Sequence, residues 1–354
     1  MSEQSNSNLP GPVDVVLREA AATGGVNGIV MVFDEPTAAL VAATVAAGAS
    51  EVLAHCDTGF AVPLPRGARE VDLDALAPEN GTVALAVGVL PKSLAELAEI
   101  SQRVASQLPE ARLILGGREK HLVRSMNEVL AESYAQVRAS RGHRKSRALV
   151  AAAPRTPVPS IFPVADRIPD YDLEVRAFGG AFAGATLDIG TRALLEQLES
   201  RYGDTAGRTD VPSTVVDLGC GTGVLASWAA RRWPQARVIA TDRSAAAVRS
   251  ARATAAANGL SIGVVRADAG ADIAAGCADL VLLNPPFHAG REVDPAVANR
   301  MFAGAARLLR PGGELLTVYN SHLRHRPHLE RLVGPTEQLS RNEKFIVTRS
   351  AAPR

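Results

Sequence analysis

The stretch that decides the fold is VVDLGCGTGVL, residues 215–225. An apolar run leads into three glycines at alternate positions, Gly219, Gly221 and Gly223, and then into a helix-forming sequence. Glycines at this spacing let the backbone turn sharply and approach a ligand, with the amides at a helix start facing that ligand. Val224 follows at once, so the loop lacks the third glycine or alanine of the dinucleotide fingerprint. It predicts a site for a nucleotide-like cofactor that departs from the dinucleotide pattern.

Three acidic residues accompany this loop. Asp217 lies in the strand before it, Asp242 closes the next expected strand, and Asp268 follows the strand after that. A carboxylate at a strand end can accept hydrogen bonds from both hydroxyls of a ribose. A lone aspartate in such a place is more often a helix N-cap. Three of them in register with a glycine loop favour cofactor binding.

Short β-branched or leucine-rich runs alternate with alanine-rich helical stretches along the whole chain. This alternation predicts an α/β fold in each half, with a mostly parallel sheet and helices on both faces. The expected strands are 28–33, 51–55, 82–90, 112–116, 213–217, 237–241, 262–266, 279–283 and 313–319, and the expected helices are 36–48, 92–107, 223–232, 244–257 and 295–309.

Length and proline content predict the domain organisation. A chain of 354 residues is too long for one ordinary core, which favours two domains. Prolines recur through residues 151–163 and fit neither helices nor central strands. We therefore expect one domain over residues 1–150, a linker over 151–170 and a second domain over 171–354.

The two halves also match each other in sequence. Twenty residues separate Thr37 from Asp57, as they separate Thr222 from Asp242, and the strands between fall in register. Chance matches among alanine- and leucine-rich segments are the alternative explanation. Duplication of one α/β domain is the simpler one.

A second motif, Asn284-Pro285-Pro286-Phe287, ends an apolar strand about 61 residues after Gly223. The Asn284 side-chain oxygen and the Pro285 carbonyl could accept both protons of a planar nitrogen, leaving its lone pair directed at an electrophile. The prolines would fix the turn, and Phe287 would stack on a planar target. Such a turn can be purely structural. Its place beside the glycine loop favours a catalytic role.

These motifs resemble those of a known family. The loop is similar to motif I of class I S-adenosylmethionine-dependent methyltransferases, and the second motif resembles the signature of methyltransferases acting on planar nitrogens. Together with 182–192, 310–313 and 342–347, they look like the tandem-domain ribosomal RNA guanine-N2 methyltransferases. The resemblance implies S-adenosyl-L-methionine as cofactor, contacted by Asp217, Gly219, Gly221, Gly223, Asp242, Asp268, Asn284 and Asp188.

In that family the first domain is a degenerate copy. Here Asp34, Pro36 and Ala38 stand opposite the three glycines, which adds a carboxylate, removes an amide donor and adds a Cβ. Residues 90–93, Leu-Pro-Lys-Ser, stand opposite the second motif without its amide or ring. The sequence predicts a silent first domain that orients RNA or supports the second. Residues 90–94 favour the large-subunit (23S) branch over the small-subunit (16S) branch.

Alternative functions remain open from the residues. The same four motif residues serve methylation of adenine N6 and of a protein glutamine amide. An inert RNA-binding assembly factor is a different class, and it would bind RNA without cofactor. A nicotinamide dehydrogenase fits worst, because of Val224 and the lack of an evident proton-transfer residue.

Composition narrows the setting. A net charge of +1 argues against bulk coating of nucleic acid, and three widely spaced cysteines fit neither a disulfide framework nor a zinc site. No leader or spanning segment is evident, so a cytoplasmic protein without a metal is expected. Two basic runs could contact RNA phosphates, although each could equally be a solvated surface. Their candidates are Arg138, Arg141, Arg144, Lys145, Arg147, Arg324 and Arg326.

Overall fold

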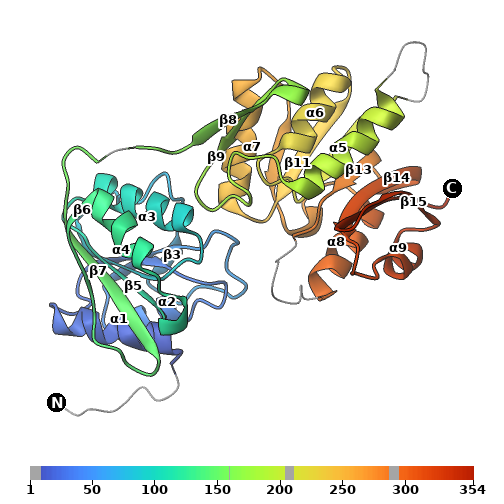
Figure 1. Cartoon of the computed structure of the whole chain (residues 1–354). Coiled ribbons are helices and arrows are strands. Elements are labelled where there is room, and N and C mark those ends of the chain that lie inside the picture. Colours follow the sequence, from blue (N-terminus) through green and yellow to red (C-terminus); the bar gives the residue numbers. More distant parts are fainter. Residues whose placement is uncertain (1–8, 159, 204–210, 287–294) are drawn as a thin grey trace. The chain divides into compact units, whose positions relative to one another are not determined.

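The computed structural model describes residues 9–158, 160–203, 211–286 and 295–354. The chain forms two compact units, Met1–Phe162 and Pro163–Arg354 (Figure 1). Each unit is an α/β domain built on its own seven-stranded sheet. Among the described residues, every helix is too short or too polar to traverse a bilayer.

Unit 1 has the strand order β3-β2-β1-β4-β5-β7-β6. Strand β7 pairs antiparallel with both β5 and β6, and the other neighbouring strands pair in parallel. Apolar residues of α1 and α2 cover one face, and those of α3 and α4 cover the other. Its elements are α1 (Gly11–Ala22), β1 (Ile29–Phe33), α2 (Ala39–Ala46), β2 (Glu51–His55), β3 (Ala68–Glu70), β4 (Val83–Val89), α3 (Leu94–Gln107), β5 (Arg112–Arg118), η1 (Glu119–His121), α4 (Arg124–Ser133), β6 (Tyr134–Ala139) and β7 (Ser146–Pro154).

Unit 2 repeats this topology, with the order β12-β11-β10-β13-β14-β16-β15. Helices α5, α6 and α7 pack on one face, and α8 and α9 pack on the other. Its elements are β8 (Val164–Ile168), η2 (Pro169–Tyr171), β9 (Leu173–Ala177), α5 (Ile189–Tyr202), β10 (Thr214–Leu218), α6 (Val224–Arg232), β11 (Arg237–Asp242), α7 (Ala245–Ala257), β12 (Gly263–Arg266), η3 (Asp268–Gly270), β13 (Ala278–Leu283), α8 (Pro295–Leu308), β14 (Leu309–Asn320), α9 (Arg326–Leu332), β15 (Thr336–Arg341) and β16 (Phe345–Ala351).

Helices on both faces explain the sequences of the central strands. Val215, Val216 and Leu218 of β10 are at most 1% exposed, as expected for a parallel strand covered on both sides. The strand therefore reads as a continuous apolar run interrupted only by Asp217. The predicted α/β fold class is confirmed.

The two units share more than strand order. Residue Ala38 precedes α2 with φ 54° and ψ 27°, and Gly223 precedes α6 with φ 78° and ψ 22°. Both are left-handed conformations, so the same turn joins the first strand to its helix in each unit. The shared order and turn support the interpretation of a duplicated domain.

The linker is shorter than the predicted 151–170. Residues 151–154 complete β7, which pairs with β5 on one side and β6 on the other. Residues 164–168 form β8, which pairs with β9 in unit 2. Backbone pairing with β5, β6 and β9 outweighs the local proline-rich composition, and Pro154 stands at the end of its strand, where a missing donor is tolerated.

Candidate active site

The two motifs of unit 2 meet at one edge of its sheet. β10 pairs in parallel with β11 on one side and β13 on the other. Their carboxyl ends carry the glycine loop, Asp242 and Asn284 respectively. Ligands of open α/β sheets bind at this edge. The structure thus brings together the residues that the sequence placed on separate segments.

The glycine loop requires its glycines for different reasons. All three have positive φ angles, 77° at Gly219, 52° at Gly221 and 78° at Gly223. A Cβ on Gly219 would lie 2.7 Å from Met301 Cε, and one on Gly223 would lie 2.9 Å from Ala251 Cβ. A Cβ on Gly221 would meet nothing within 4 Å. The outer glycines therefore permit packing, whereas the middle one faces open space that a ligand can enter.

Asp217 is buried beneath this loop. Its Oδ2 accepts a hydrogen bond from the Ala226 amide at 2.9 Å, and its Oδ1 has no hydrogen-bond partner among the described residues. Burial raises the pKa of Asp217 to about 7; the Ala226 hydrogen bond opposes this rise and nearby Asp242 adds to it. An unsatisfied buried oxygen is costly, so it marks a position where a bound group can donate a hydrogen bond.

We predict that Asp217→Asn stabilises the fold above neutral pH. The folded state holds a proton on Asp217 up to about pH 7, whereas the unfolded chain loses it near 3.8. Wild-type stability from this group therefore falls as pH rises from about 4 to 7, and the loss is complete above 7. Asparagine keeps an oxygen for the Ala226 amide and removes this loss. Urea unfolding at several pH values should show a gap that widens up to pH 7; a constant gap would contradict the assignment.

Asp242 and Asp268 lie at the ends of β11 and β12. The Asp242 carboxylate accepts from the Gly221 amide at 3.1 Å and from the Ser244 amide at 2.9 Å, so it braces the loop. A carboxylate offers about four acceptor sites, so Asp242 can also receive ribose hydroxyls. The half-exposed Asp268 forms an ion pair with Arg300 at 3.2 Å. Their contacts with a cofactor stay a prediction.

The Asn284 side-chain amide is hydrogen-bonded through its nitrogen, whereas its oxygen is available as an acceptor. Nδ2 donates to Asp188 Oδ2 at 3.0 Å and to Thr191 Oγ1 at 2.8 Å. The buried Oδ1 has no hydrogen-bond partner among the described residues. Asp188 also caps α5, because the same Oδ2 accepts from the Thr191 amide at 3.1 Å. The site therefore presents a free, oriented acceptor.

A close approach of α5 makes this arrangement possible. A Cβ on Gly190 would lie 3.0 Å from Asp188 Oδ2 and 3.2 Å from Asn284 Oδ1. Real Cβ atoms seldom come so near, so glycine at this position leaves room for the amide. Sequence reasoning had assigned no role to Gly190 or Thr191. An Asp-x-Gly-Thr segment at a helix start was the available signal, but its partner lies 96 residues away.

The rest of the second motif is only partly described. Pro285 is buried and Pro286 is exposed. Phe287, predicted to stack on a planar target, lies outside the described residues.

In unit 1 a carboxylate occupies the corresponding turn. Asp34 follows β1 where Gly219 follows β10, and its Oδ2 accepts from the amides of Leu40 and Val41 at 2.8 and 2.9 Å. Burial raises the pKa of Asp34, and these hydrogen bonds oppose the rise. The amides that open α2 are therefore already satisfied by the chain itself.

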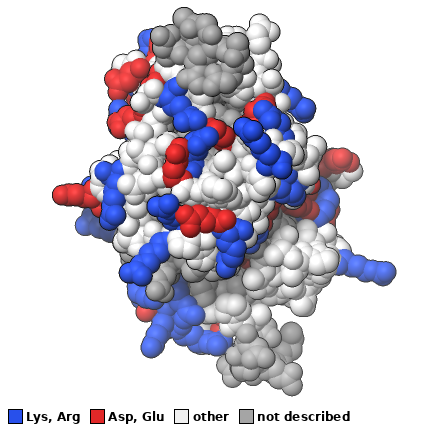
Figure 2. Space-filling view, turned by 90° about the vertical axis from the view of Figure 1, so that its right-hand side faces the viewer, with Lys and Arg blue, Asp and Glu red and all other residues white. Residues whose placement is uncertain are grey.

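Most predicted RNA-contacting arginines pair with acidic residues of the protein. Arg138 pairs with Glu19, Arg144 with Asp14, Arg147 with Glu119 and Arg326 with Glu330. Basic and acidic side chains are also interspersed over the middle of the face in Figure 2. Among the described residues, the remaining three have no acidic side chain within ion-pair distance: Arg141, Lys145 and Arg324.

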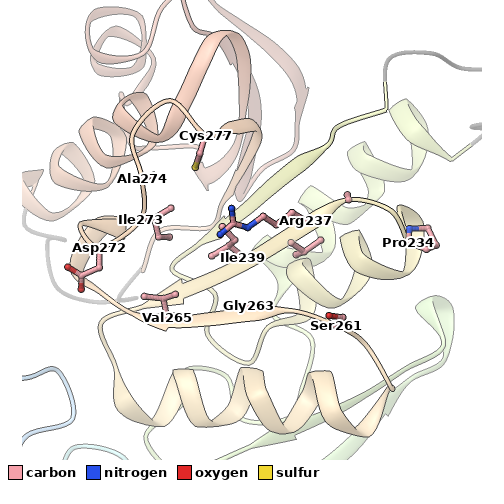
Figure 3. A pocket seen from close by; sticks show the side chains of 12 residues that line it. Pro234, Arg237, Ile239, Ser261, Gly263, Val265, Asp272, Ile273, Ala274 and Cys277 are labelled. Atoms are coloured by element: carbon pink, nitrogen blue, oxygen red, sulfur yellow. The ribbon is translucent and has the colours of Figure 1, made fainter.

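A cavity of about 360 Å³ lies away from the motifs. Figure 3 shows its lining side chains, which include Arg237 at the start of β11 and Cys277 before β13. These are the amino ends of the strands, opposite the edge that carries Asn284. The cavity is therefore not the candidate site. Within the described ranges, no group of three or more His, Cys, Asp or Glu side chains is placed to hold a metal ion.

Fold and site together define a methyltransferase of class I architecture, and comparisons with known proteins agree. Residues 172–349 match the Methyltransferase small domain family, and residues 67–155 match the RLMG N-terminal domain. A solved T. thermophilus 16S rRNA N2 methyltransferase, in complex with AdoMet and guanosine, has a TM-score of 0.74 at 22% identity. The match covers 99% of this chain and 94% of that one, which shows a common fold over both units.

Two curated relatives indicate the family. Ribosomal RNA large subunit methyltransferase G of Streptomyces coelicolor is 36% identical over 315 residues, which are 81% of this chain and 80% of that protein. The protein of the same name from Shewanella amazonensis is 36% identical over 265 residues, 73% of this chain and 66% of that protein. The chain belongs to this methyltransferase family.

Proposed function

We propose that this chain transfers a methyl group from S-adenosylmethionine to the exocyclic N2 amine of a guanine in ribosomal RNA, with large-subunit RNA favoured. The curated relatives carry large-subunit ribosomal RNA in their name. The chemistry of the site supports the nitrogen target. The family supports a methyltransferase as the class of enzyme.

One observation carries the proposal: the Asn284 amide is oriented by its nitrogen, and its Oδ1 has no hydrogen-bond partner among the described residues. The N2 lone pair of guanine is delocalised into the ring, so the amine is a weak nucleophile. An acceptor that draws one N–H into a fixed hydrogen bond favours the pyramidal amine, whose lone pair points away from the ring plane. No strong base is needed, because the methylated amine is acidic enough to lose its proton to water.

The residues of the glycine loop fit the cofactor. Open space at Gly221 can admit it, and the orphaned Asp217 Oδ1 can accept from an ammonium group. Asp242 can receive ribose hydroxyls, and Asp268 the adenine amine. When bound, S-adenosylmethionine supplies an electrophilic methyl group. The chain's own residues bind it, hold the amine beside it and align the two.

Incubation with labelled cofactor and unmodified ribosomal RNA tests the proposal. We expect label in large-subunit RNA at one guanine and none in RNA that already carries the modification. Absence of transfer by the native protein would overturn it. Label on an adenine or on a protein glutamine would replace the target with one of the alternatives, and RNA affinity without cofactor affinity would point to an inert factor.

Unit 1 is proposed to be silent in catalysis. The Asp34 carboxylate already accepts hydrogen bonds from the helix-start amides that a cofactor would need. In addition, Leu90 follows β4 at the position where Asn284 follows β13. Removal of Asp34 alone would not restore a site without the amide. Its exposed Arg141 and Lys145 fit a role in holding RNA, through phosphates and without base choice.

Arg324 is the best-placed candidate for a phosphate contact near the site. It follows β14, whose carboxyl end lies at the same sheet edge as Asn284. Arg324→Ala should weaken RNA binding and reduce the slope of log affinity against log salt by about one. Arg237→Ala is the matched control, since it removes an exposed arginine at the opposite edge. Equal salt slopes in both variants, measured by fluorescence anisotropy, would argue against the contact.

A further inference from the structure

We propose that Asp188 and Thr191 are positioning residues that lock the orientation of the Asn284 amide, so that its oxygen rather than its nitrogen faces the substrate amine. This inference rests on the proposed function and explains how Asn284 Oδ1, the acceptor in that function, is oriented. Neither residue needs to touch the substrate. Both act through Asn284.

Orientation matters because the two ends of a carboxamide have opposite hydrogen-bonding character. The oxygen accepts, and the nitrogen can only donate. A half-turn about the terminal torsion would present N–H groups to the N–H groups of guanine N2, and the hydrogen bond would be lost. An amide without fixed partners can make that turn, since this torsion has a broad, roughly two-fold profile.

The contacts favour one of the two orientations. In the observed state Nδ2 donates to two acceptors, Asp188 Oδ2 at 3.0 Å and Thr191 Oγ1 at 2.8 Å. After a half-turn, the amide oxygen would face the Asp188 carboxylate, which has no proton to donate. The hydrogen bond to the Asp188 carboxylate therefore decides the orientation, whereas the Thr191 hydroxyl, which can accept or donate, adds a second contact that restricts the torsion. In this orientation Oδ1 has no hydrogen-bond partner among the described residues.

Backbone features hold the lock in place. Asp188 has extended backbone angles and caps α5 through the Thr191 amide, so its carboxylate is fixed by the helix start. Because Gly190 has no Cβ, this turn can pack closely against the Asn284 side chain. The carboxylate contacts Nδ2, the end of the amide opposite Oδ1. There it polarises the amide and favours the positive charge that develops on N2 as the new bond forms.

Substitutions at positions 188 and 191 distinguish the orientation of the Asn284 amide from the capping of α5. Asp188→Ser keeps a capping oxygen but is too short to reach Asn284. We expect kcat to fall by about 10- to 100-fold, with the melting temperature nearly unchanged. Thr191→Val should lower kcat about fivefold, and Thr191→Ser should restore it. A rise in KM with kcat unchanged would overturn the inference.

The pH profile of Asn284→Asp offers a second test. Two carboxylates would then lie about 3 Å apart, so one pKa of the pair must rise. Transfer by this variant should increase as the pH falls and the pair takes up a proton that bridges positions 188 and 284. Asp188→Asn combined with Asn284→Asp should lose that pH dependence and exceed the single variant at pH 8. A flat profile for Asn284→Asp would count against the contact.

A readout without catalysis distinguishes this inference from the proposed function. The side-chain amide protons of Asn284, assigned by their loss in Asn284→Ala, should shift in the NMR spectra of Asp188→Ser and Thr191→Val. Unmoved resonances would overturn the lock even in an active enzyme. If the resonances move and the wild-type protein transfers no methyl, the lock stands and the proposed function fails.

Discussion

Asn284→Ala should lower the rate of methyl transfer by about 10²- to 10³-fold, the effect of removing one fixed polar group that acts in a transition state. The variant also loses the two hydrogen bonds that Nδ2 donates to Asp188 and Thr191, so its melting temperature and its affinity for S-adenosylhomocysteine are measured alongside the rate. Single-turnover rates at saturating RNA measure the effect directly. They separate chemistry from binding and product release.

A matched control is Asn320→Ala, which removes an amide at the end of the neighbouring strand β14. This variant should retain a rate within about twofold of the wild type. Comparable losses in both variants would mean that position 284 has no special role. Undiminished transfer by Asn284→Ala would contradict the assignment outright.

Gly221→Val should weaken the binding of S-adenosylhomocysteine by at least about 100-fold. The residue has a φ of 52°, where a β-branched side chain is strained by roughly 1–2 kcal/mol, and its Cβ would enter the open space of the loop. The strain is present with and without ligand and lowers stability, so the loss of affinity comes from the obstruction; a 100-fold loss corresponds to about 2.8 kcal/mol. Isothermal titration calorimetry measures the change.

Gly259→Val controls for the strain alone. Gly259 follows α7 with a φ of 62°, and a Cβ there meets nothing within 4 Å, so the backbone cost is similar. This variant should lose stability but bind S-adenosylhomocysteine as the wild type does. If Gly221→Val bound equally well, the open space at the loop would not be the cofactor site.

The sequence predicted the central strands and the helices that follow them closely. Strand β2 was expected at 51–55 and begins and ends there. Strands β1 and β13 differ from expectation by one residue at one end, and β4 and β10 by one residue at each end. Long apolar runs bounded by glycine, proline or aspartate carry this signal locally. The glycine loop and Asn284 followed from the same strands, because a parallel sheet brings their carboxyl ends to one edge.

Elements that depend on distant partners were missed. Residues 151–154, the end of β7, were assigned to the linker, because their alanines and final proline are poor local signals, and pairing with β5 and β6 decides their structure. Helix α5 was not predicted, although Asp188 at its start is a good N-cap. The contact between Asp188 and Asn284 spans 96 residues, and no periodicity in one sequence indicates it.

The ion pairs of the basic run could not be predicted from the sequence either. The basic run at 138–147 looked like an RNA-binding segment, yet α1 contributes Asp14 and Glu19 to it from far along the chain. In unit 1 the sequence predicted a carboxylate opposite the glycine loop. It did not show that this carboxylate would accept hydrogen bonds from the helix amides in place of a ligand.

The most direct test of the central claim is nucleoside mass spectrometry of large-subunit ribosomal RNA after incubation with S-adenosylmethionine and either the wild-type protein or Asn284→Ala. We expect N2-methylguanosine at one position with the wild type, and at least about 100-fold slower formation with the variant. A methylated product on another base, or equal N2-methylguanosine from both proteins, would contradict it.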